Sequence, residues 1–213
     1  MKRGDIMIRA IEGGLLGSNT YVVYNDTGKT AMIVDCGTRS DRAIDFINKM
    51  GLTVKYIVLT HGHFDHAHYT DEYASAFSNA EIICHAEELK VLLNPDANLS
   101  SFVSEEKAYR FPYKTVEDGD IITLEGGNDG EDLSLEIIHS PGHTPGSICL
   151  LCKERSFMLT GDTLFKCGYG RTDFMYGSPS QLRSSLRRLL SLDGDIKFYP
   201  GHGESSTISK ERY

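Results

Sequence analysis

Short apolar segments rich in β-branched residues recur along the chain, and they constrain its fold more than any other feature of the sequence. In the first half they cover residues 5–11 (DIMIRAI), 20–24 (TYVVY), 31–37 (AMIVDCG) and 54–60 (VKYIVLT). In the second half they cover residues 114–124, 133–140, 147–152 and 156–162. Runs of this length and composition, bounded by Gly, Asn or Asp, are typical of strands. We therefore expect a strand-rich chain.

Helical patterns lie between these predicted strands. The apolar residues of 40–50 recur at helical spacing, and Gly51 suits the end of that helix. A later helix is predicted to begin at Ser178 as its N-cap, with Pro179 in the first turn. Strands followed by helices, repeated twice, predict two sheets that face each other with helices outside, in a single domain spanning residues 1–213.

Composition disfavours several classes of function. The 213 residues are 40% apolar, and the net charge of -8 argues against a broad nucleic-acid-binding face. No apolar run approaches the ~18 residues of a membrane span, and the N-terminal segment lacks the apolar core of a signal peptide. Five cysteines, an odd number, then favour reduced thiols and a cytoplasmic location. Cys149 and Cys152 lie three apart on a predicted strand, so we expect buried thiols on opposite faces.

Four of the eight histidines lie within residues 61–68 (HGHFDHAH). His61 and His63 follow a predicted buried strand, and positions i and i+2 of an extended chain lie on the same side. Both imidazoles can therefore reach one ion. Asp65 and His66 come next, where a turn of the chain can direct them toward a second ion. The alternative is a polar loop that is merely rich in histidine.

Three further candidate ligands lie just beyond other predicted strands, each beside glycine or proline. They are His143 in SPGHTPGS, Asp162 in LTGDTLF and His202 in YPGHGE. Glycine lets the backbone turn sharply, and loops at strand ends commonly carry functional side chains. Imidazole and carboxylate groups are common metal ligands. Together with the earlier cluster, they predict a metal site of five histidines and two aspartates.

This set of residues resembles the motifs of the metallo-β-lactamase superfamily and, within it, the glyoxalase II-like hydrolases. The H-x-H-x-D-H motif and the later ligands of the family stand here as His61, His63, Asp65, His66, His143, Asp162 and His202. The resemblance also covers GSNTYVV (17–23), VDCGT (34–38), GDTLFKCGYGRTDF (161–174) and YPGHG (199–203), nearly the whole chain. It implies an α+β fold, the αββα sandwich of two mixed β-sheets with helices on the outer faces.

The resemblance implies a chemistry as well. One ion would take His61, His63 and His143, the other would take Asp65, His66 and His202, and Asp162 would bridge them. We expect two divalent ions, zinc first, with iron or manganese equally suited to these ligands. Two such ions clamp a hydroxide that serves as nucleophile, which Asp65 would help to orient. The expected activity is hydrolysis of thioesters or related small esters, as in hydroxyacylglutathione hydrolases.

The chain departs from the family pattern at two places. His68 and Tyr69 stand where a glycine pair is usual, and we expect His68 to be exposed or to lie beside the ligands. After His202 comes only GESSTISKERY, without the basic helical domain of true glutathione-thioester hydrolases. Arg171 is then the candidate for binding a substrate anion, the alternative being an ion pair with Asp173. Residues 94–112 and 166–176 are expected to flank the metal cleft.

Other functions remain open on the same residues. GRTDF (170–174) also resembles persulfide dioxygenases, in which two histidines and one carboxylate hold a single iron. The retained His66 and His202 favour the hydrolase, and a lactonase is a further alternative. A non-catalytic binding protein is disfavoured because the ligand set is complete. A β-lactamase is disfavoured because Asp162 replaces the cysteine of one large class, and a nuclease because the chain is acidic.

Overall fold

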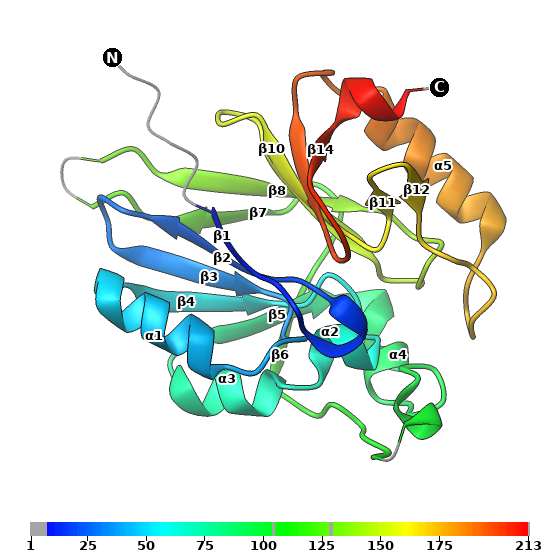
Figure 1. The fold of residues 1–213 in the computed structure, drawn as a ribbon, viewed down its shortest axis with the longest axis horizontal. Helices are drawn as coiled ribbons and strands as arrows, with labels where there is room; N and C mark the ends of the chain where they lie inside the picture. The colour runs from blue at the N-terminus through cyan, green and yellow to red at the C-terminus, as the bar shows by residue number, and fades with distance from the viewer. Residues whose placement is uncertain (1–7, 104, 128–129, 213) are drawn as a thin grey trace.

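The computed structural model describes residues 8–103, 105–127 and 130–212, and their fold is shown in Figure 1. In this part of the chain, two mixed β-sheets lie face to face and helices cover their outer faces. The predicted α+β fold with an αββα arrangement is confirmed. Residues 5–7 of the first predicted strand lie outside the described residues.

The first sheet comes from the N-terminal half of the chain. Its strands, in spatial order, are β1 (Ile8–Ile11), β2 (Thr20–Asn25), β3 (Thr30–Val34), β4 (Thr53–Val58), β5 (Glu81–His85) and β6 (Tyr113–Val116). Strands β1 to β3 pair antiparallel, whereas β3 to β6 pair parallel. Helices α1 (Asp41–Met50) and α3 (Thr70–Ala76) run along its outer face (Figure 1). The carboxyl ends of the parallel strands therefore open at one edge.

The second sheet comes from the C-terminal half. Its strands, in spatial order, are β14 (Ser206–Thr207), β13 (Lys197–Pro200), β10 (Phe157–Gly161), β9 (Ile148–Cys152), β8 (Leu133–His139) and β7 (Ile121–Leu124). Only β10 and β13 pair parallel, which makes this sheet mixed as well. A small hairpin joins β11 (Leu164–Phe165) to β12 (Gly168–Tyr169), and α5 (Pro179–Leu190) covers the outer face.

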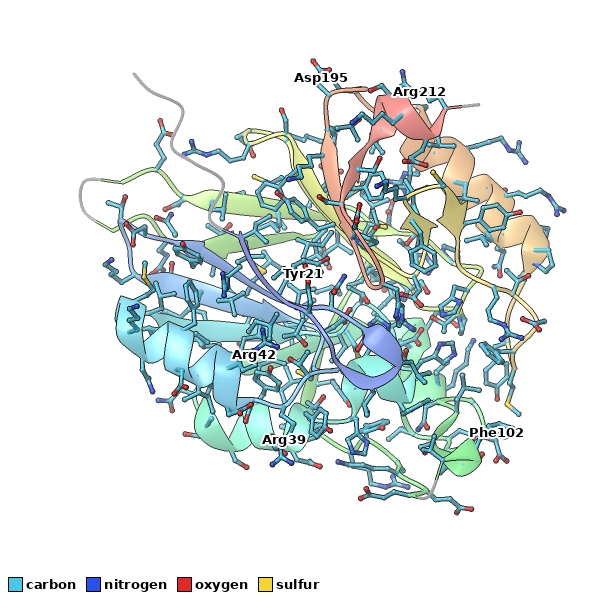
Figure 2. The ribbon with its side chains drawn as sticks, in the orientation of Figure 1. Tyr21, Arg39, Arg42, Phe102, Asp195 and Arg212 are labelled. Carbon is cyan, nitrogen blue, oxygen red and sulfur yellow. The ribbon has the colours of Figure 1, made fainter. Side chains whose placement is uncertain are left out.

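Side chains of successive strand residues enter different apolar clusters. Val22 packs among residues of α1 and α3, whereas Val23 faces the second sheet. Cys152 likewise lies between the sheets while Cys149 packs toward α5, so the predicted opposite faces are confirmed. Tyr21 lies between the two sheets, and its hydroxyl donates to the Pro200 carbonyl at 2.7 Å (Figure 2). Burial of both faces explains why the strands are apolar almost throughout.

The helix ends follow the predicted chemistry. Gly51 adopts φ 64° at the end of α1, a left-handed conformation that glycine adopts at little cost. Ser178 caps α5 by accepting a hydrogen bond from the Gln181 amide, and Pro179 opens the helix. No helix in the described ranges has both the length and the apolar content needed to cross a bilayer.

Residues 114–124 are not one strand, contrary to the sequence-based expectation. They contain the end of β6 and the whole of β7, which belong to different sheets. The break lies at Glu117–Asp120, where the Glu117 amide donates to the Asp120 carboxylate at 2.8 Å and Gly119 has φ 87°. The chain crosses from the first sheet to the second at this turn.

Candidate metal centre

The predicted ligands gather at one end of the space between the two sheets. His61, His63, Asp65 and His66 follow β4, the last two on the short helix α2 (Phe64–Ala67). His143 follows β8, Asp162 follows β10, and His202 follows β13. Each half of the chain thus contributes side chains from loops at the ends of its strands. All seven have mostly or fully buried side chains, His202 being the most exposed at 26%.

Their donor atoms form three overlapping groups, within each of which the atoms lie within 4.8 Å of one another. These groups are His61, His63 and His143; His61, His66 and Asp162; and Asp65, His66 and His202. We call His61, His63 and His143 the first ligand set, and Asp65, His66 and His202 the second ligand set. All seven side chains predicted as ligands are therefore brought together.

The chemistry of these side chains fits a metal ion. The Nε2 atoms of His61, His63 and His143 and the Oδ1 atom of Asp162 are buried, and no hydrogen-bond partner for them lies among the described residues. Buried polar atoms without a partner are rare in folded proteins because each is costly. Three convergent imidazole nitrogens beside a carboxylate are what a divalent cation requires. The first ligand set would hold one ion through its three Nε2 atoms.

Asp162 lies between the two ligand sets. One of its oxygens is 3.4 Å from His66 Nε2, and the other is 3.6 Å from His143 Nε2 and 3.6 Å from His202 Nε2. A single carboxylate therefore approaches histidines of both sets, which is the position that a bridging ligand would occupy.

The second ligand set lies among several carboxylates. Asp65 Oδ2 lies 3.2 Å from His202 Nε2 and 3.7 Å from His66 Nε2. Burial lowers the pKa of His66, but Asp162, Asp65 and Asp35 outweigh it and raise this pKa to about 10. Burial also opposes ionisation of Asp65, yet His66 and His202 lower its pKa to about 2. The same negative potential attracts a divalent cation.

The first ligand set is neutral by contrast. Burial, reinforced by the neighbouring histidines, lowers the pKa of His61 well below its ordinary value. The pKa values of His63 and His143 are also lowered, again chiefly by burial. These three imidazoles are therefore uncharged near neutral pH, so their nitrogen lone pairs are free to bind a metal. The Nδ1 atom of His143 faces the Arg171 carbonyl at 2.7 Å, which directs Nε2 into the centre.

Sequence reasoning missed Asp35 as a functional residue. Its carboxylate lies 2.9 Å from His66 Nδ1 and accepts hydrogen bonds from the Thr60 amide and hydroxyl, each at 2.8 Å. Its backbone has φ 61°, a conformation that non-glycine residues seldom adopt. The signal was present, because Asp35 directly follows a buried strand and lies two residues before Gly37, and the later predicted ligands also lie near glycine just beyond a strand.

Glu88 was also missed. This fully buried carboxylate accepts hydrogen bonds from the Gly62 and Gly146 amides, both at 2.7 Å, and from the Thr144 hydroxyl at 2.8 Å. Gly62 separates His61 from His63, and Thr144 follows His143, so one carboxylate ties together the two loops of the first ligand set. The sequence offered no signal, since Glu88 stands among charged residues that resemble an exposed helix face.

The loop of His202 depends on a glycine. A Cβ atom on Gly201 would lie 2.2 Å from Asp162 Oδ1 and 2.7 Å from His66 Cε1, so no other residue fits without displacing these ligands. The same loop is fixed to the first sheet, because the Asn19 amide donates to the Gly201 carbonyl at 2.7 Å. These contacts explain why the first glycine of the YPGHG motif, Gly201, is required.

A cavity of about 340 Å³ opens onto the centre. Leu99 lines it from the segment 94–112, and Tyr169, Arg171 and Phe174 line it from the segment 166–176. The prediction that both segments flank the site is therefore confirmed.

Two other predicted residues interact with groups outside the seven ligand side chains. Arg171 lines the cavity, but its Nε donates to Asp173 at 2.6 Å and its guanidinium lies 4.1 Å from the centre of the Phe174 ring. The ion pair weighed as the alternative role of Arg171 is thus present. His68 is absent from the three donor groups formed by the described residues, and its Nε2 lies 3.9 Å from Glu105.

The fold and the cluster of histidines and aspartates define a class of metal-dependent enzymes. Residues 13–202 match the family model of the metallo-beta-lactamase superfamily, and the chain belongs to that superfamily. It is 35% identical over 205 residues to hydroxyacylglutathione hydrolase GloC of Haemophilus influenzae, covering 91% of this chain and 89% of that protein. Membership supports a metallo-hydrolase that acts on a small molecule.

Two solved structures agree with this assignment. The crystal structure of BLEG-1 B3 metallo-beta-lactamase superposes with a TM-score of 0.84 at 31% identity, covering 96% of each chain. The crystal structure of TTHA1623 in a di-iron-bound form superposes with a TM-score of 0.81 at 28% identity, covering 95% of this chain and 96% of that chain.

Proposed function

We propose that this protein is a metal-dependent hydrolase of thioesters or related small esters, similar to hydroxyacylglutathione hydrolases. The observation that carries the proposal is the position of Asp162 between two complete ligand sets. That geometry supports two divalent ions, with zinc as the first choice and with iron or manganese suited to the same imidazole and carboxylate ligands. The similarity to GloC supports the thioester class of substrate.

Two divalent ions would supply Lewis acidity and a bound water of lowered pKa. The chain's own residues would position the reactants. Asp65, with a pKa of about 2, is ionised at neutral pH and lines the cavity, where it can accept a hydrogen bond from the attacking water. Asp35 and the Arg171 carbonyl hold the ligand imidazoles of His66 and His143 in orientation.

The test combines metal analysis with turnover on one preparation. Purified protein is stripped of metal, reloaded with zinc, and assayed for release of thiol from a hydroxyacyl-glutathione thioester. We expect two ions per chain and turnover that rises with the second ion. Full turnover with one ion, or no thioester hydrolysis in the zinc-loaded protein, would contradict the proposal.

A mononuclear iron dioxygenase acting on a persulfide is the second candidate. The group of His61, His66 and Asp162 favours it, because two histidines and one carboxylate form the facial set of non-haem iron oxygenases. The two candidates differ in oxygen consumption. Iron-loaded protein that consumes oxygen with a low-molecular-weight persulfide, and that leaves thioesters intact, would favour the dioxygenase.

A further inference from the structure

The cavity at the candidate centre is lined by mostly buried donor groups and by more exposed apolar side chains. We call the buried donor groups, among them His63, Asp65 and Asp162, the floor of the cavity. Leu16, Phe165 and Phe174 stand on separate segments and line the same cavity. Tyr169, 64% exposed, adds a ring from the hairpin of β11 and β12. A substrate bound at the floor therefore meets apolar side chains as it extends outward.

Leu16 is the most informative of these side chains. Its side chain is 74% exposed and therefore contributes little to the core. Its backbone has φ 52°, a left-handed conformation that is costly for a branched residue. An exposed leucine in a strained conformation beside a cavity is best explained by a contact with a ligand.

The loop that carries Leu16 is held firmly against the candidate centre. The Leu15 amide donates to the Gly37 carbonyl at 3.0 Å, and the Ser18 hydroxyl donates to the Asp65 carbonyl at 2.7 Å. Ser18 also forms a β-bridge with His202. The Leu16 side chain is therefore presented from a backbone that shares hydrogen bonds with two ligand segments.

The charges around the cavity disfavour a substrate with several anionic groups. Among the described residues that line it, Arg171 is the only lysine or arginine, and its guanidinium is already paired with Asp173. Asp65 and Asp162 add negative charge at the floor, which the proposed ions would balance. A thiol carrier with two free carboxylates, such as glutathione, would find no unpaired cation on these walls.

We propose that the wall of Leu16, Phe165 and Phe174 binds an apolar acyl chain, so that the preferred substrates are thioesters of apolar acyl groups on an uncharged thiol carrier. This inference rests on the proposed thioesterase function and specifies its substrate class. Each buried methylene contributes about 0.8 kcal/mol, which corresponds to about a fourfold gain in kcat/KM. The gain should continue until the chain fills the cavity.

The experiment uses the full zinc-loaded chain and a series of acetyl, butanoyl and hexanoyl thioesters of N-acetylcysteamine, with matched glutathione thioesters. We expect kcat/KM to rise about fourfold per methylene, and the N-acetylcysteamine thioester to exceed its glutathione counterpart. Leu16→Gly should reduce the gain in kcat/KM to below about twofold per methylene. Glycine is chosen because it adopts φ 52° without strain, so the loop should keep its conformation. Ile121→Ser is the matched control, because Ile121 is 66% exposed on the edge strand β7.

The outcomes separate this inference from the proposed function. A series without dependence on chain length, a glutathione thioester turned over faster than its neutral counterpart, or an unchanged gain in Leu16→Gly would overturn the apolar substrate class. Each of these would leave the thioesterase in place. No turnover of any thioester by protein that holds two zinc ions would overturn the proposed function itself.

Discussion

The two ligand sets of the candidate centre are built from the same kinds of side chain but are supported in different ways. In the second ligand set, the supporting carboxylate of Asp35 lies 2.9 Å from a ligand imidazole, that of His66. In the first ligand set, the supporting carboxylate is that of Glu88, and among the described residues none of its hydrogen bonds comes from a ligand side chain. It accepts from backbone amides and a hydroxyl beside the ligands.

This difference separates electrostatic support from geometric support. Asp35 adds negative charge beside His66 and contributes to its raised pKa. Glu88 fixes the distance between two loops whose imidazoles stay neutral. We therefore expect the metal affinity of the second ligand set to depend mainly on nearby charge. The metal affinity of the first ligand set should depend mainly on loop geometry.

The largest effect is expected at Asp162, which both sets share. Asp162→Asn removes the negative charge and keeps the shape, whereas Asp162→Ala removes the donor atoms. Both should lose the second ion and reduce kcat more than about 100-fold, the upper range for residues that support a ligand. The fold should survive because the apolar clusters lie elsewhere. Metal analysis, circular dichroism and thioester turnover measure this, and two retained ions with near-normal turnover would refute the bridging role.

Asp35→Asn should weaken the second ligand set selectively. The amide keeps the shape but loses the charge beside His66, so we expect affinity for one ion to fall about 10- to 100-fold. Stepwise zinc titration followed by calorimetry measures the two affinities, and anomalous scattering from crystals locates the ion that is lost. An equal loss of affinity for both ions would contradict the distinction between the two ligand sets.

Glu88→Gln should weaken the first ligand set instead, by about tenfold. A glutamine side chain presents one NH₂ group, which would face a backbone amide that is itself a donor, Gly62 or Gly146. The two loops would then separate and misalign His143 from His61. Glu87→Gln is the matched control, since Glu87 is exposed and pairs with Lys90. Selective loss of the ion at His66 and His202 would contradict geometric support.

The pH dependence of folding gives a smaller effect from the same carboxylate. Burial raises the pKa of Glu88 from 4.5 to about 7, against the hydrogen bonds of Thr144, Gly62 and Gly146 that lower it. Between these values the folded protein binds a proton that the unfolded chain has released. The stability that Glu88 contributes is therefore complete below about pH 4.5 and is lost as pH rises through about 7.

Urea unfolding of metal-free wild type and Glu88→Gln, compared from pH 4.5 to 8, measures this contribution. The wild type should lose stability relative to Glu88→Gln as pH rises. A difference that is constant across the range would show that the three hydrogen bonds offset burial, and a change in the opposite direction would show that they outweigh it.

The smallest effect is expected at His68. Its imidazole lies near Glu105 and meets the Tyr69 ring edge to face, with ring centres 4.8 Å apart. We expect His68→Ala to keep both ions and to change kcat less than about tenfold, within the range of residues that support a site indirectly. Loss of one ion on metal analysis would add His68 to the ligands and change the composition of the second ligand set.

The sequence predicted the parts of the centre that depend on local rules. His61 and His63 alternate just beyond a buried strand, and glycines mark the loops of His143 and His202. It did not predict Glu88, because its hydrogen-bond partners lie 26 to 58 positions away and include backbone amides, which leave no trace in residue type. It also joined residues 114–124 into one segment, because apolar and β-branched residues continue on both sides of Glu117–Asp120, and residue type does not show that the chain changes sheet there.

The crossing at Glu117–Asp120 divides the ligands between two parts of the polypeptide. The N-terminal part carries His61, His63, Asp65 and His66, and the C-terminal part carries His143, Asp162 and His202. Neither part can complete either ligand set, so each ion would bind only when the two sheets are docked. Metal binding and docking are then linked by mass action. If the chain is divided at this exposed turn, the two fragments should associate with higher affinity as zinc is added, because the ions bind only to the docked sheets.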